Sequence, residues 1–234
     1  MIVDGIELHL TRKNIKNMHL YVKPPHGAVF VSAPLLISER QIKRFVRNNL
    51  AWIAQKQEKI ARQPLPPERR YESGETLFVW GEPYLLQVNY GTRYSLELVD
   101  ATAVFTARRA STPVQRERFI REWYRAQLKS EVAHLLPKWE AVTGLQCAGW
   151  QSKYMTSKWG TCNSAKQRIW LNVQLAKRPL ECLEYVIVHE LVHLRIRNHG
   201  AEFKELMSSH LPQWKVLRKK LNEPMTEGRV EAAL

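Results

Sequence analysis

The stretch YVIVHELVHL, residues 185–194, joins an apolar run to the motif H-E-x-x-H. On a helix, positions four apart share one face, so His189 and His193 can offer two imidazole nitrogens to one metal ion. Zinc suits such ligands, and Glu190 between them can take a proton from a water bound to the zinc. The stretch therefore predicts a hydrolytic metal centre on a helix that begins near Pro179.

The motif also arises by chance, on helices whose histidines face solvent or a metal-free core. Its surroundings argue against chance here, because residues 180–188 are mostly apolar and Leu191, Leu194 and Ile196 continue the apolar pattern. Burying two histidines and a glutamate in such a helix is costly unless something pairs with them. We therefore favour the metal site.

A third ligand is expected because three protein ligands and one water make a catalytic zinc site. His199 follows His193 closely, and a turn at residues 198–200 before a short helix over 201–209 can bring it back to the metal. Zinc favours nitrogen ligands, which makes His199 the first choice. The competing candidates lie farther along the chain: Glu202, Glu205 and His210.

Several segments together resemble one known family. These are WGTCNS at 159–164, RIWLN at 168–172, the stretch 185–194, and Asn198-His199 with Phe203. They are similar to the YgjP-like metallopeptidases, which are related to the SprT and WLM groups of small zinc peptidases. The resemblance implies zinc ligands at His189, His193 and His199 and a catalytic glutamate at Glu190. Thr161 stands where serine is usual, and the resemblance supplies no substrate.

Composition sets wider bounds. The chain has 234 residues, of which 44% are hydrophobic, so it can bury a core of one large or two small domains. No apolar run reaches membrane-spanning length, and the first residues lack the pattern of a secretory signal. Cys147, Cys162 and Cys182 form no C-x-x-C pair, which predicts reduced thiols in a cytoplasmic protein. Cys162 could approach the metal, but an inert thiol is the favoured interpretation.

The chain is strongly basic, with 36 Lys and Arg against 22 Asp and Glu and a net charge of +14. Anionic partners are therefore favoured. Each basic cluster alone is more often a solvated face, but with Trp52, Trp123 and Tyr124 nearby the clusters would allow a nucleic-acid groove. The clusters are Arg40, Lys43, Arg44 and Arg47; Arg116, Arg118, Arg121 and Arg125; and Arg218, Lys219 and Lys220.

Apolar and polar residues alternate in parts of the first half of the chain, as they do in β-strands. Residues 18–22 and 28–32 predict a hairpin around the turn 24–27, and Ser38 with Gln41 predicts a capped helix that reaches the proline-rich break at 64–67. Four short strands should then form a small antiparallel sheet. They are expected at 76–80, 84–89, 94–99 and 103–107, and no internal repeat is evident.

The second half begins with a helix from Thr112 to about residue 136, where Gln115 completes a capping box. We place the domain boundary there, giving residues 1–111 and 112–234. The expected class is α+β, with a small antiparallel-sheet N-terminal part and a compact zincin-like C-terminal domain. That domain should hold strands near 149–156 and 168–174, the zinc helix and one or two short helices.

These features favour a zinc-dependent metallopeptidase that cleaves peptides or unfolded protein, with Glu190 as general base. The substrate could pair with an exposed strand edge at residues 149–156. One alternative is a DNA-associated protease acting on nucleic-acid-bound proteins, as the SprT and WLM relatives suggest. Another is a zinc-stabilised binding module without turnover. The candidates for stabilising the oxyanion are Tyr154, Lys158 and Tyr185.

Overall fold

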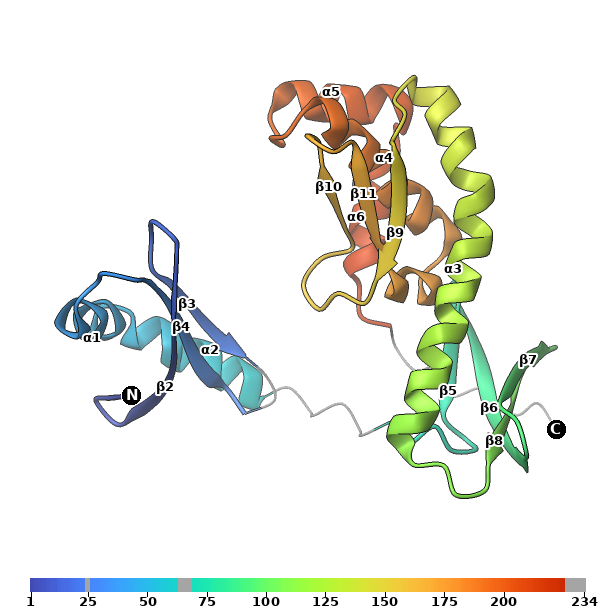
Figure 1. Cartoon of the computed structure of the whole chain (residues 1–234), viewed down its shortest axis with the longest axis horizontal. Helices are drawn as coiled ribbons and strands as arrows, with labels where there is room; N and C mark the ends of the chain where they lie inside the picture. Colours follow the sequence, from blue (N-terminus) through green and yellow to red (C-terminus); the bar gives the residue numbers. More distant parts are fainter. Residues whose placement is uncertain (24–25, 63–68, 226–234) are drawn as a thin grey trace. The chain divides into compact units, whose positions relative to one another are not determined.

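The computed structural model of the chain describes residues 1–23, 26–62 and 69–225. It combines helices with small mixed sheets, so the α+β class is confirmed (Figure 1). The chain divides into two compact units, Met1–Glu68 and Arg69–Leu234. No helix within the described ranges combines the length and apolar character that a membrane span needs.

The first unit is a four-stranded sheet with two helices. The expected hairpin is present as β3 and β4, although Pro24 and Pro25 of its turn lie outside the described residues. Two earlier strands were not predicted, and β2 runs parallel to β4, so the sheet is mixed. The order is β1-β2-β4-β3, with β1 at Ile2–Val3, β2 at Ile6–Lys13, β3 at His19–Lys23 and β4 at Ala28–Pro34.

One face of this sheet is buried. Val29, Val31 and Ala33 alternate along β4 and are at most 1% exposed. They belong to one apolar cluster with Ile42 and Ile53 of the two helices. The helices therefore cover this face of the sheet.

The single helix expected after Ser38 is two helices, α1 at Glu39–Arg47 and α2 at Leu50–Ala61. The Ser38 capping box is present. The break falls at Asn48 and Asn49, and the Asn49 side chain donates to the Phe45 carbonyl (2.8 Å). Asparagine ends helices readily because its side chain competes for backbone hydrogen bonds. The expected proline-rich break at 64–67 lies outside the described residues.

The second unit opens with another four-stranded sheet. The four strands appear where they were expected, but β6 and β8 are parallel, so the expectation of an antiparallel sheet is wrong. Alternation locates strands and does not say which strand lies next to which. The order is β5-β6-β8-β7, with β5 at Thr76–Val79, β6 at Glu82–Gly91, β7 at Ser95–Val99 and β8 at Thr102–Arg108.

This second sheet repeats the first, strand for strand. Both sheets start with a hairpin whose two turn residues have positive φ, Asp4-Gly5 in one and Trp80-Gly81 in the other. Both end at a capping box, and the capped segments are SERQIKRFVR at 38–47 and TPVQRERFIR at 112–121. The fold therefore contains a repeat that is not evident in the sequence. The shared residues are few, and the identical order of strand pairing makes the repeat visible.

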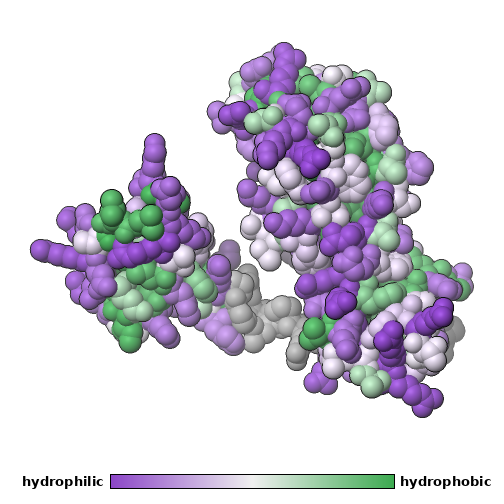
Figure 2. Space-filling view, in the orientation of Figure 1, coloured by the Kyte–Doolittle hydropathy of each residue, from purple (hydrophilic) through white to green (hydrophobic). Residues whose placement is uncertain are grey.

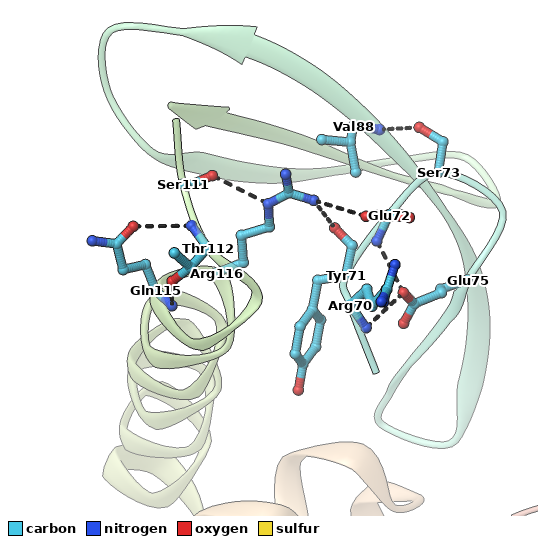
Figure 3. Close-up of polar contacts among 10 residues, drawn as sticks. All are labelled: Arg70, Tyr71, Glu72, Ser73, Glu75, Val88, Ser111, Thr112, Gln115 and Arg116. Atoms are coloured by element: carbon cyan, nitrogen blue, oxygen red, sulfur yellow. Dashed lines mark hydrogen bonds and ion pairs between the residues drawn. The ribbon is translucent and has the colours of Figure 1, made fainter. Parts of the chain in front are cut away.

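Helix α3 spans Pro113–Thr143 and ends at Gly144, whose φ is 67°. It runs past Pro137 and is longer than expected. Near its start the buried Arg116 donates to Ser111 Oγ (3.1 Å) and to the Tyr71 carbonyl (3.3 Å) (Figure 3). These contacts tie the first turns of α3 to Ser111 and to the segment before β5, and the expected boundary between residues 111 and 112 lies within the second unit.

The remaining strands of the second unit form a third sheet, which has three strands. Its order is β10-β11-β9, with β9 parallel and β10 antiparallel to β11. Helix α4 packs against β10 and β11, and α3 runs beside β9 (Figure 1). The strands are β9 at Gly149–Lys153, β10 at Gly160–Asn163 and β11 at Arg168–Asn172. A 3-10 turn at Val173–Lys177 precedes α4 at Leu180–Arg195, α5 at Ala201–His210 and α6 at Trp214–Asn222.

Candidate metal centre

Three imidazoles converge at the end of α4. His189 and His193 lie one turn apart on that helix, and His199 comes from the turn before α5. Their Nε2 atoms are 3.2 Å apart for His189 and His193 and 3.1 Å apart for the other two pairs. Ligands about 2.0–2.1 Å from a tetrahedral zinc are about 3.3 Å from each other, so the three nitrogens fit such an ion.

The surrounding residues hold these rings in place. His193 Nδ1 lies 2.9 Å from the Ile196 carbonyl oxygen, which can only accept, so the contact selects the tautomer with the proton on Nδ1 and the lone pair on Nε2. Phe203 of α5 is 1% exposed, and its ring centroid lies 4.7–5.0 Å from all three imidazole centroids. Phe203 is part of the family resemblance, but its contact with the histidines could not be predicted, because only the folded chain brings α5 against them.

Burial favours the neutral form of His189 and of His199. The pKa of His189 is lowered to about 3, first by burial and then by the neighbouring His193 and His199. Burial and His193 also lower the pKa of His199. Neutral imidazoles present lone pairs, which is the form that binds a metal ion.

Glu190 lies on the same helix and is 4% exposed. Burial raises its pKa to about 8, while the nearby Lys158 ammonium opposes that rise. Its Oε2 has no hydrogen-bond partner among the described residues. A methyl group on Gly160 of β10 would lie 2.5 Å from Glu190 Oε1, so a glycine is needed where β10 passes the carboxyl group. A buried carboxyl without a partner, beside three convergent nitrogens, suits a site that receives a cation and water.

A cavity of about 540 Å³ opens over these groups. The free edge of β10, from Gly160 to Cys162, forms one wall. Among the described residues that line the cavity, Glu190 is the only acidic one. Three cationic residues also line the cavity: Lys158, Arg197 and Arg218. Arg197 donates to Ser164 Oγ (3.0 Å). Arg218 comes from the basic run of α6, which reaches the cavity only through tertiary packing.

The other expected site residues are placed as follows. Lys158 and Tyr185 line the cavity, whereas Tyr154 is absent from its described lining and packs under the Arg121 guanidinium, 4.3 Å from the ring centroid. The alternative ligands do not join the described histidine cluster or the cavity wall: Glu202, Glu205 and His210. The edge strand beside the metal centre is β10, and not the expected segment 149–156.

Cys162 lines the cavity, but its thiol is neutral. Burial, followed by the charge of Glu190, raises its pKa to about 11. Cys147 and Cys182 are also free thiols, and burial raises their pKa values too. None of the three is activated as a thiolate nucleophile.

A helix that carries H-E-x-x-H, with a third histidine from the next turn and a strand edge beside the glutamate, defines the class of metallopeptidases. The chain belongs to the YgjP-like family: the model of the YgjP-like, metallopeptidase domain matches residues 16–224. Membership makes the chain a metallopeptidase, acting on peptides or proteins, and implies a bound metal ion.

Two solved structures are also similar to part of the chain. The metallopeptidase zymogen abylysin of Pyrococcus abyssi is 19% identical over 38% of this chain and 90% of its own, with a TM-score of 0.36. The metallopeptidase zymogen jannalysin of Methanocaldococcus jannaschii is 20% identical over 38% of this chain and 92% of its own, with a TM-score of 0.35. No curated protein matches the chain.

Proposed function

We propose that the protein is a zinc-dependent peptidase whose metal is held by His189, His193 and His199, with Glu190 as the general base. The observation that carries the proposal is the convergence of three Nε2 atoms, 3.1–3.2 Å apart, beside a buried carboxyl group. Zinc is the ion that three neutral imidazoles in this geometry favour.

Zinc bound there would supply a Lewis acid that activates water and polarises the scissile carbonyl. Glu190 would accept the proton of the attacking water and pass it to the leaving amine. Without a cation the Glu190 pKa is about 8, and a positive charge at the histidines would lower it and favour the carboxylate that a base requires. Lys158 and Tyr185 are the remaining candidates to stabilise the oxyanion, since both line the cavity.

The free edge of β10 offers a place for the substrate backbone. An extended peptide that paired with this edge would lie along the cavity wall, close to Glu190. Main-chain pairing recognises any extended segment, which agrees with peptides or unfolded protein as substrates. The cations Lys158, Arg197 and Arg218 would in addition favour acidic side chains near the scissile bond.

The test is hydrolysis of an unfolded protein by the purified chain, before and after removal of metal with a chelator. We expect activity to vanish on chelation and to return with about one equivalent of zinc per chain. Activity that requires DNA would instead support the DNA-associated protease. Stoichiometric zinc without any hydrolysis would support the binding module.

A further inference from the structure

Within the described residues of the first unit, one face of the sheet is not covered by a helix and carries aromatic rings; it is called here the open face. His9 of β2, Phe30 of β4 and Tyr21 of β3 are direct cross-strand neighbours and form one row, called here the aromatic row. The His9 and Phe30 rings are stacked, with centroids 4.6 Å apart and an interplanar angle of 21°. His19 stacks beside Tyr21 at 6.3 Å and 25°. The His9 and Phe30 rings therefore face each other, and the exposed rings His9 and Tyr21 at the two ends of the row are the ones accessible to a partner.

These rings are not part of the core. The core lies on the opposite face, where Leu8, Val29 and Val31 meet α1 and α2. On the open face His9 is exposed and Tyr21 is 47% exposed. Exposed aromatic side chains grouped on one surface favour recognition of a partner over packing.

The charge around the aromatic row is mainly positive. Lys23 Nζ lies 4.3 Å from the Phe30 ring centroid, and Lys13 and Lys16 are exposed at the other end of β2. The first 68 residues contain 11 Lys and Arg against five Asp and Glu. On the side of this unit visible in Figure 2, hydrophilic side chains surround smaller hydrophobic patches. Such a surface attracts an anionic partner that also has flat apolar parts.

The repeated sheet provides an internal comparison. By register, the positions of His9, Phe30 and Tyr21 correspond in the second sheet to Gln87, Val104 and Glu97. The same strands in the same order therefore form without aromatic residues there. The fold does not require the aromatic row, which leaves binding as its explanation.

Helix α3, the other basic segment with nearby aromatic residues, is occupied by internal contacts. Tyr124 is 3% exposed and donates to the Phe78 carbonyl, and Trp123 Nε1 donates to the Leu96 carbonyl. Arg121 is paired with Glu117, and Arg125 with Glu122. The two aromatic side chains of α3 are therefore used for internal contacts, which makes the open face of the first unit the better candidate for stacking bases.

We propose that the open face of the first unit binds single-stranded nucleic acid. Unpaired bases would stack on the aromatic row, and the lysines around it would contact the phosphates. Duplex bases already stack on each other and cannot reach the rings, so the site should prefer single strands. Stacking tolerates any base, and the expected sequence preference is weak.

Fluorescence anisotropy with the full chain tests the proposal, using labelled oligothymidylate and oligouridylate of about 12 nucleotides and a duplex of equal length. Tyr21→Ala and His9→Ala should each weaken single-strand binding about 10-fold, the scale of one lost stacked base, and leave duplex binding unchanged. Tyr21→Phe keeps the ring and should bind as the parent does. Glu97→Ala, at the equivalent position of the second sheet, is the matched control.

Salt provides a second measurement. Each phosphate contact adds about 0.7 to the log-log salt slope of a single strand, so Lys13→Ala or Lys23→Ala should lower that slope. Circular dichroism checks that each variant is folded. No single-strand binding at low salt, or parent-like binding by both Tyr21→Ala and His9→Ala, would overturn the proposal. Equal losses on single strands and duplex would also overturn it, because charge alone would then explain binding.

Discussion

The two copies of the repeated module share a strand order and a capped helix, but their helices differ. In the first copy Asn49 stands at the helix break, whereas Trp123 continues α3 at the equivalent position. Ile42 is fully buried in the first core, and the equivalent Arg116 is buried in the second through hydrogen bonds to Ser111 and Tyr71. The same arrangement of strands and capped helix therefore packs around two different cores.

The difference in helix length determines which other elements each copy contacts. The long α3 connects its sheet to the metal-binding part of the unit: Arg125 donates to the Ser152 carbonyl, and Trp139 Nε1 donates to Glu184 of the metal helix. The short α1 has no such extension. The second copy therefore supports the metal centre, while the first is a separate unit with an open face.

The largest expected effect is loss of metal and activity on mutation of a metal-binding histidine, compared with a histidine of the open face. His193→Ala removes one of three converging nitrogens, so bound metal should fall far below one ion per chain and peptidase activity should fall to background. His9→Ala, on the open face of the first copy, should keep full metal content and activity. Metal analysis and a peptidase assay on both variants measure this difference. Full metal in His193→Ala would contradict the proposed ligand set.

A second test makes equivalent cavities in the two copies. Ile120 and Val46 occupy the same position of the repeat and are at most 1% exposed. Ile120→Ala should destabilise the unit with the metal centre by about 2–4 kcal/mol and lower the temperature of peptidase inactivation. Val46→Ala should leave that temperature unchanged, because its core is separate. A shift of the same size in both variants would show that the two copies unfold together.

Much of the metal centre could be predicted because its residues are close in sequence. Spacing alone places His189 and His193 on one helical face, and His199 is near enough to return. Gly160 and Arg218 could not be connected with the site, because β10 and α6 reach it only through tertiary packing. Strand positions followed from alternation in the same way.

The pairing of the strands and the repeat could not be predicted from local sequence patterns. A parallel pair such as β6 and β8 depends on how β7 folds back, and alternation carries no information about that. The capping boxes at Ser38 and Thr112 were both predicted and are both present. That both capped helices belong to copies of one module follows only from the shared order of the strands.

Glu190 should make the stability of the second unit depend on pH. The Glu190 pKa rises from 4.5 to about 8 on folding of the metal-free chain, so the folded state keeps a proton that the unfolded state has lost. The free energy of unfolding contributed by this group should therefore fall as pH rises through that window. Glu190→Gln lacks the titration, so its stability relative to the parent should increase by about 1–3 kcal/mol between those pH values. Chemical unfolding of both chelated proteins measures the difference. A pH-independent difference would show that the carboxyl group is not desolvated.

A smaller effect is expected at β10. Gly160→Ala places a methyl group 2.5 Å from Glu190 Oε1, which forces the carboxyl group or the strand to move. Activity should fall about 10-fold or more with metal content retained, because misplacing a catalytic group by about 1 Å is costly. Gly200→Ala is the matched control, since nothing lies within 4 Å of a Cβ there. Equal activities of the two variants would mean that the Glu190 position does not limit catalysis.

The most direct measurement combines metal content and peptide hydrolysis in Glu190→Gln at a pH where the parent is active. Glutamine preserves the shape of the side chain and cannot act as a base, and Glu190 is not one of the three proposed ligands. We expect one zinc ion per chain and an activity at least about 100-fold below that of the parent. Hydrolysis at the parent rate with zinc bound would contradict it, and the histidines would then belong to a structural or binding site.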